Sequence, residues 1–131
     1  MAITPKGCIK YRLLGKEKQR EMIVSKVESQ LEAAIDAQLL EDETRYPHKI
    51  RHYIHFYIDD EFAGMNARRY IRNEDDKRHM PLPLTKEERS RVYTSLAEKY
   101  QTLGWYVTGL SENWDGRNMH IEMTLGNPYA I

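Results

Sequence analysis

The chain of 131 residues has one cysteine, Cys8, so no internal disulfide can form. Small secreted domains usually rely on paired cysteines, and we therefore expect a reducing compartment, the cytoplasm. No run of about 20 apolar residues is present to span a membrane, and residues 1–14 are too polar for a signal peptide. A chain of this length can fold without disulfides or metals. The sequence predicts one domain over residues 1–131, with flexible ends at 1–8 and 126–131.

The chain also has no net charge, because its 20 basic and 20 acidic residues cancel. No overall electrostatic attraction therefore draws this chain to nucleic acid. The charges are unevenly spread: residues 1–20 carry six basic and one acidic side chain, and residues 21–44 carry seven acidic and one basic. The simplest interpretation of the acidic block is the solvated face of a helix, because charged side chains are mostly exposed.

The motifs of several chemistries are missing as well. The glycines are scattered, so the sequence has no glycine-rich phosphate loop. His48, His52 and His55 are close in sequence, but His52 and His55 point to opposite faces of a predicted strand and cannot converge on one metal ion. We therefore expect no metal, no cofactor and no catalytic residue. A metal-dependent phosphodiesterase that uses the acidic run 59–61 with one histidine is a weaker alternative.

Apolar periodicity predicts the secondary structure. Apolar residues recur at helical spacing from Lys16 to about Leu40 and again after Thr85, which forms a capping box with Glu88. Side chains alternate from His48 to Asp60, which is typical of a strand with one buried face. The other predicted elements are a short strand over 9–14, a long loop over 62–84 with a short helix at 65–71, a strand over 105–111, a turn at 113–116 and a last strand over 119–125.

The second helix is expected to bury one apolar stripe and to end at Gly104, which suits a left-handed C-cap. The residues of this stripe are Val92, Leu96, Tyr100 and Leu103, with Tyr93 and Ala97 beside them.

This order of elements predicts an α+β domain, a two-layer sandwich with two helices on one face of a three- or four-stranded, mainly antiparallel sheet. Because a helix connects them, the strands containing Ile54 and Val107 could instead pair in parallel. A loop as long as residues 62–84 is unusual in a compact domain and indicates a functional or mobile segment.

The candidate binding residues are basic or aromatic and lie on the outer face of the predicted sheet or in the long loop. Such residues on an open sheet suit base stacking and phosphate neutralisation. Tyrosine and arginine are also enriched at protein interfaces. The candidates are Arg51, Tyr53, His55 and Tyr57 from the strand over 48–60, Arg68, Arg69, Tyr70 and Arg72 from the loop, and Tyr106 from the strand after the second helix.

These residues leave two functions open. The preferred hypothesis is a non-enzymatic protein-binding or self-assembling module, whose partner is another protein or a second copy of the chain. The alternative is binding of RNA, single-stranded nucleic acid or a nucleotide by the same face, and no membrane partner is expected. In its small size, neutrality and tyrosine content, the chain resembles accessory proteins encoded by viruses of bacteria. This resemblance is one of general character and rests on no motif.

Overall fold

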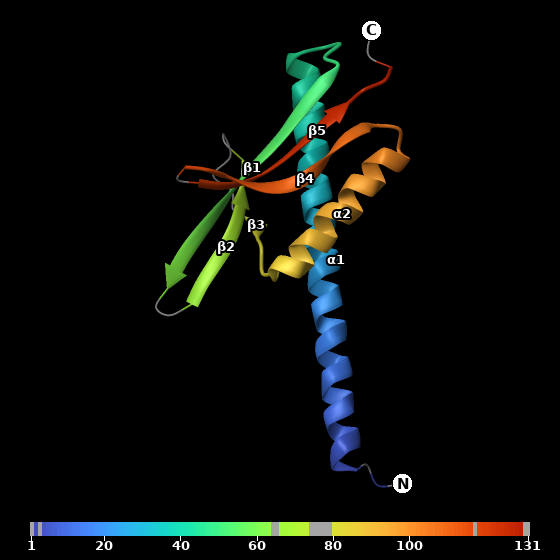
Figure 1. Ribbon diagram of the computed structural model, residues 1–131, viewed down its shortest axis with the longest axis vertical. Coiled ribbons are helices and arrows are strands. Elements are labelled where there is room, and N and C mark those ends of the chain that lie inside the picture. Colours follow the sequence, from blue (N-terminus) through green and yellow to red (C-terminus); the bar gives the residue numbers. More distant parts are fainter. Residues whose placement is uncertain (1, 3, 64–65, 74–79, 117, 130–131) are drawn as a thin grey trace.

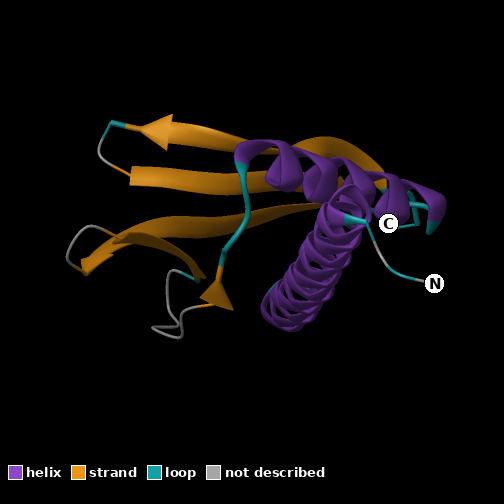
Figure 2. Ribbon diagram, turned by 90° about the horizontal axis from the view of Figure 1, so that it is seen from below, coloured by secondary structure: helices purple, strands orange, loops and turns teal. Residues whose placement is uncertain are grey.

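The computed structural model describes residues 2, 4–63, 66–73, 80–116 and 118–129. The elements are α1 (Pro5–Arg45), β1 (Arg51–Ala63), β2 (Asn66–Arg72), β3 (Met80–Pro81), α2 (Lys86–Thr102), β4 (Tyr106–Asp115) and β5 (Asn118–Gly126). The strands form one antiparallel sheet in the order β3-β2-β1-β5-β4, with both helices on one side (Figures 1 and 2). The predicted α+β two-layer fold is confirmed, with five strands in place of three or four.

The alternative of a parallel pair between the strands containing Ile54 and Val107 is wrong. These residues lie on β1 and β4, and β5 separates the two strands while pairing antiparallel with both.

The N-terminal helix starts earlier than the periodicity predicts. It begins at Pro5, after Thr4, whose hydroxyl accepts a hydrogen bond of 3.0 Å from a backbone N–H of the first turn. The predicted strand over residues 9–14 is wrong, because this segment lies within α1. Gly15 does not end the helix, since one internal glycine costs only about 1 kcal/mol relative to alanine. Apolar residues four apart in this segment also share one side of a helix.

Only the C-terminal half of α1 packs on the rest of the domain. Its buried residues are Val27, Leu31 and Ile35, whereas Met22 is 73% exposed. A helix of 41 residues is about 60 Å long at 1.5 Å per residue. Its N-terminal part, residues 5–22, projects away from the sheet, and we call this part the arm (Figure 1). Among the described helices, none is both long and apolar enough to cross a bilayer.

The inner face of the sheet and the two helices enclose one core. Alternation along β1 and β5 correctly predicts which of their side chains face the helices. The buried apolar residues are Val27, Leu31, Ile35, Ile54, Phe56, Ile58, Ile71, Leu82, Leu84, Val92, Tyr93, Leu96, Tyr100, Leu110, Ile121, Met123 and Leu125.

The long loop predicted over residues 62–84 is wrong for the described residues that form strands, and so is the short helix at 65–71, whereas residues 73 and 82–84 have no regular secondary structure. Residues 66–72 form β2, a hairpin partner of β1, with Ile71 buried opposite Ile58. Opposite charges support this pairing, because Arg69 lies across from Asp60 and their side chains form an ion pair of 3.1 Å. Residues 74–79, which belonged to the predicted loop, lie outside the described residues.

The second helix agrees with the sequence at its N-terminus. The capping box between Thr85 and Glu88 is present, and Gly104 follows the helix with a φ of +107°. Leu103 is an exception: it is 68% exposed rather than buried. The predicted turn at 113–116 is also shorter than expected, because β4 continues to Asp115.

A side chain of α1 stabilises the free edge of β1. Before Tyr57, no strand among the described residues pairs with β1 on the side where β2 pairs further along. There the Gln38 amide donates to the backbone oxygen of His55 (2.9 Å) and accepts from its backbone nitrogen (3.2 Å). Gln38 also donates to Asn73 (2.8 Å). These bonds occupy backbone groups of the sheet beside the outer-face aromatics.

Candidate protein-interaction surface

The sheet face opposite the helices carries most of the predicted binding residues. On β1, Arg51, Tyr53, His55 and Tyr57 alternate with the core residues, and the register places Tyr57 across from His120 on β5. We call this surface the outer sheet face; its described members are Arg51, Tyr53, His55, Tyr57 and Asp59 of β1, Arg68, Tyr70 and Arg72 of β2, Tyr106, Thr108, Ser111 and Asn113 of β4, and His120, Glu122 and Thr124 of β5.

Aromatic rings form a continuous row along β1. The rings of Tyr53 and His55 stack with centroids 5.7 Å apart, and His55 meets Tyr57 edge-on at 4.6 Å. The neighbouring strand extends the row sideways, because the rings of His55 and His120 are 4.7 Å apart. The rings therefore contact one another rather than standing separately in solvent.

Charged groups at both ends of the row already have partners. The Arg72 guanidinium lies 4.6 Å from the centre of the Tyr57 ring, and its Nε donates to Asp59 (2.5 Å). Glu122 accepts hydrogen bonds from the Tyr53 hydroxyl and from the Asn113 amide. These contacts fix the ring positions, and the pair of Arg72 and Asp59 neutralises its own two charges.

Two tyrosines nevertheless present most of their surface to solvent. Tyr53 is 54% exposed and Tyr106 is 71% exposed. Tyrosine carries a large apolar area on only two rotatable bonds, so little conformational entropy is lost when a partner covers it. These two side chains are the most accessible aromatic positions of the outer sheet face.

Not all of the predicted site residues in the segment 68–72 lie on this surface. Arg72 does, whereas Arg69 points to the other side of β2 and pairs with Asp60. Arg68 and Tyr70 alternate with Arg69 on β2, so they lie on the same face as Arg72, and they also line a separate cleft at the sheet edge. The sequence did not single out Glu122 and Asn113, although Glu122 follows the same alternation as His120 on β5.

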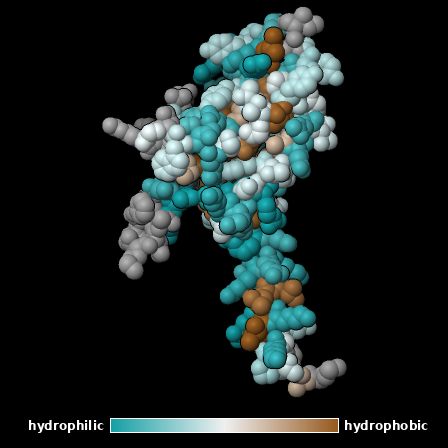
Figure 3. All heavy atoms as spheres, viewed as in Figure 1, coloured by the Kyte–Doolittle hydropathy of each residue, from teal (hydrophilic) through white to brown (hydrophobic). Residues whose placement is uncertain are grey.

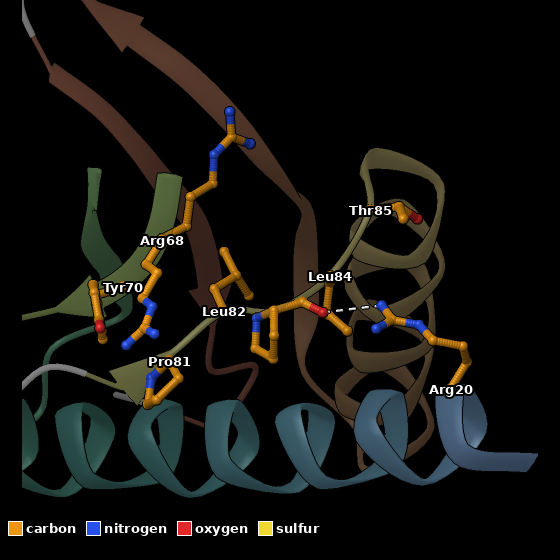
Figure 4. Close-up of a pocket in the computed structure, with 9 residues that line it drawn as sticks. Arg20, Arg68, Tyr70, Pro81, Leu82, Leu84 and Thr85 are labelled. Atoms are coloured by element: carbon orange, nitrogen blue, oxygen red, sulfur yellow. Dashed lines mark hydrogen bonds between the residues drawn. The ribbon is translucent and has the colours of Figure 1, made fainter. Parts of the chain in front are cut away.

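This separate cleft, of about 630 Å3, lies between α1, β2 and the segment that leads into α2 (Figure 4). Arg20 reaches from α1 and donates to the backbone oxygen of Pro83 (2.9 Å) and to both carboxylate oxygens of Glu88. The cleft is lined by Arg20, Arg68, Arg69, Tyr70, Pro81, Leu82, Pro83, Leu84 and Thr85. Because Arg20 and Arg69 are occupied by internal carboxylates, they serve the fold rather than a ligand.

Replacing Arg20 by alanine is expected to raise the pKa of Glu88. The hydrogen bond from Arg20 is the main reason that the pKa of Glu88 falls from 4.5 to about 2, outweighing the opposite effect of burial. A lowered carboxyl pKa stabilises the fold above about pH 4.5, and this stability is lost as the pH falls through about 2. An NMR titration of the Glu88 carboxyl carbon measures the change, and an Arg91→Ala variant serves as the control. A Glu88 pKa that stays near 2 in Arg20→Ala would refute this assignment.

The acidic run 59–61 does not assemble a catalytic centre from its described side chains. Asp59 and Asp60 point to opposite faces of β1, and each binds an arginine of β2. Among the described histidine, cysteine and acidic residues, no group of three or more is arranged to hold a metal ion. His52 is buried in the core, where its Nδ1 lies 2.7 Å from Asp42.

No protein-family model, curated protein or solved structure matches this chain. Its function must therefore be argued from the surface itself.

Proposed function

We propose that this chain is a non-enzymatic protein-binding module that holds a partner protein on its outer sheet face. The observation that supports the proposal is that both helices leave this face uncovered while Tyr53 and Tyr106 stand exposed on it. An ordered aromatic surface of this kind is typical of the centre of protein interfaces.

The internal contacts of the face favour a protein over a nucleic acid. Base stacking needs open ring faces, but Tyr53 and His55 already stack on each other. Phosphate binding needs unpaired cations, and Arg72 is held by Asp59. Arg51 remains exposed at the margin. The partner that fits is therefore a protein surface with an apolar centre and a carboxylate near Arg51.

The exposed thiol of Cys8 is consistent with a reducing compartment such as the cytoplasm, where we propose that the module acts.

The double variant Tyr53→Ala/Tyr106→Ala is expected to lose the partner. The experiment first places a photo-crosslinking amino acid at position 106 in the cells that make the protein, and identifies the crosslinked species. Binding of that purified partner is then measured for wild type and variant. Two interface tyrosines contribute about 2 kcal/mol or more, so we expect affinity to fall roughly 30-fold or more.

A matched control removes two exposed tyrosines that lie elsewhere. Tyr46 and Tyr129 are 58% and 85% exposed, and the variant Tyr46→Ala/Tyr129→Ala should bind as wild type does. Equal binding by both double variants would refute the proposal. Crosslinking to RNA or DNA, with affinity that falls steeply as salt rises, would replace the protein partner by a nucleic acid.

A further inference from the structure

Within the described residues, the arm of α1 contributes no buried side chain to the core, and only Arg20, near its end, is bonded to α2 and the segment before it. The first buried residue of α1 is Val27, so residues 5–22 gain no core packing. Isolated helices of this length are only marginally stable in water, because most helical stability in proteins comes from packing of one face. Figure 3 shows apolar side chains exposed along the arm, below the sheet. The arm therefore lacks the packing that stabilises the other half of the same helix.

The three most exposed large apolar side chains of α1 share one side of the helix, the side away from the sheet. Tyr11, Met22 and Leu40 are 70%, 73% and 71% exposed. Their separations correspond to about three and about five whole turns, so they share one side of the helix. Leu31 is about two and a half turns from Met22 and lies on the opposite, buried side. The line of these three side chains continues from the arm onto the half of α1 that packs on the sheet.

The two halves of α1 also carry opposite charge. Residues 1–20 have six basic and one acidic side chain, a net of +5, and residues 21–44 have one basic and seven acidic, a net of −6. Part of the acidic half is neutralised internally, for example by the ion pair between Lys99 and Glu32. Within the described residues, Lys10, Arg12 and Lys18 of the arm form no ion pair. An acidic surface of similar length would therefore complement the basic arm.

We infer that a second copy of this chain supplies that surface, and that two α1 helices pair antiparallel through the line of Tyr11, Met22 and Leu40. Antiparallel pairing lays each basic arm on the acidic half of the other helix, whereas parallel pairing would set like charges side by side. Packing Tyr11 against Leu40 of the second copy fixes the register. It also brings Arg12 beside Glu41 and Lys18 beside Asp36 of the second copy.

This pairing leaves the outer sheet faces uncovered, because it uses the side of α1 that points away from the sheet. The inference is therefore independent of the proposed function. The variant Tyr53→Ala/Tyr106→Ala is expected to lose its partner protein and to remain a dimer.

The first test is charge reversal, read as molar mass by size-exclusion chromatography with light scattering. Wild type is expected at twice its chain mass of 15.5 kDa. Arg12→Glu/Lys18→Glu lowers the net charge of residues 1–20 from +5 to +1, and Glu41→Lys/Glu43→Lys changes that of residues 21–44 from −6 to −2. Each variant should be monomeric, because each removes most of the charge from one of the two complementary halves. Mixing the two variants should restore the doubled mass. Lys86→Glu/Arg91→Glu, which makes the same charge change as the first variant on exposed positions of α2, should stay dimeric.

The second test determines the relative orientation of the two α1 helices by crosslinking the thiol of Cys8. In an antiparallel pair Cys8 lies near Thr44 of the second copy, so a short bismaleimide should crosslink the variant Thr44→Cys into dimers. Two proteins should remain uncrosslinked: wild type, and the variant that combines Thr44→Cys with Cys8→Ser. In each of these dimers the two thiols lie at opposite ends of the helix pair. A wild-type monomer, a dimer that survives both charge reversals, or efficient crosslinking through Cys8 alone would overturn the inference.

Discussion

Replacing Arg89 by alanine is expected to lower the free energy of unfolding by about 3 to 5 kcal/mol, because it leaves a largely buried carboxylate without its cation. Arg89 is only 6% exposed. Its Nε donates to Glu112 (2.5 Å), and its Nη1 donates to the backbone oxygen of Leu84 (3.2 Å). The Tyr93 hydroxyl donates to the same carboxylate (2.7 Å) and cannot neutralise it. Urea denaturation followed by circular dichroism measures the loss.

The pH dependence of the unfolding free energy distinguishes an unpaired Glu112 carboxylate from a simple loss of packing. Burial pushes the pKa of Glu112 upward, but the hydrogen bonds from Arg89 and Tyr93 outweigh it, and the pKa ends below its usual value. Glu112 therefore stabilises the native state above the ordinary carboxyl pKa, and this stability is lost as the pH falls through its lowered pKa. In Arg89→Ala no cation opposes the effect of burial on the pKa of Glu112. The loss of unfolding free energy relative to wild type should therefore shrink at acid pH, where the carboxyl is neutral.

The exposed Arg91 on the same helix provides the control, and Arg91→Ala should change stability by no more than about 0.5 kcal/mol. A deficit in Arg89→Ala that is the same at pH 7 and pH 3, or that matches Arg91→Ala, would contradict the explanation.

The second large effect is expected from Leu96→Ala, which should lower the free energy of unfolding by about 2 to 5 kcal/mol. Leu96 is 0% exposed and lies between α2 and the sheet, so truncation removes buried methyl groups and leaves a cavity. Leu103→Ala removes the same atoms next to the end of α2, at a residue that is 68% exposed. It should cost no more than about 0.5 kcal/mol. Equal losses in the two variants, measured by urea denaturation, would show that Leu103 is buried in solution.

The contrast between Leu96 and Leu103 also shows where apolar periodicity predicts burial and where it does not. Both residues continue one apolar stripe, but α2 ends at Thr102 and the chain turns away at Gly104. A residue at the end of a helix lacks the packing neighbours that its position in the apolar stripe predicts. Sequence spacing predicts the faces of long regular elements well and fails at their ends.

Longer-range charge pairing explains the largest error in the predicted fold. The segment with Arg68, Arg69 and Arg72 is rich in charged residues, and its pairing with the acidic end of β1, together with burial of Ile71 opposite Ile58, makes it a strand. Local propensity contains no information about such a partner. The capped helix α2 and the alternating β1 depend mainly on local signals, and the sequence predicted both.

The candidate site was predictable to a similar extent. Alternation along β1 correctly placed Tyr53, His55 and Tyr57 together, because it needs only the period of a strand. The contacts made by Glu122 were not predictable, since they depend on the register of β5 against β1. Whether a partner protein binds there remains the proposal that the tyrosine variants test.

The order of charges along α1 has a further consequence through the helix macrodipole. The N-terminus of a helix carries a partial positive charge and favours acidic side chains, and its C-terminus favours basic ones. Lys6 in the first turn and Asp42 and Glu43 in the last turn oppose this preference, and only Arg45 follows it. In a lone chain, added electrolyte relieves these repulsions and should make α1 more helical. Between two antiparallel copies the same ions screen an attraction, so helicity and association are expected to respond to ionic strength in opposite directions.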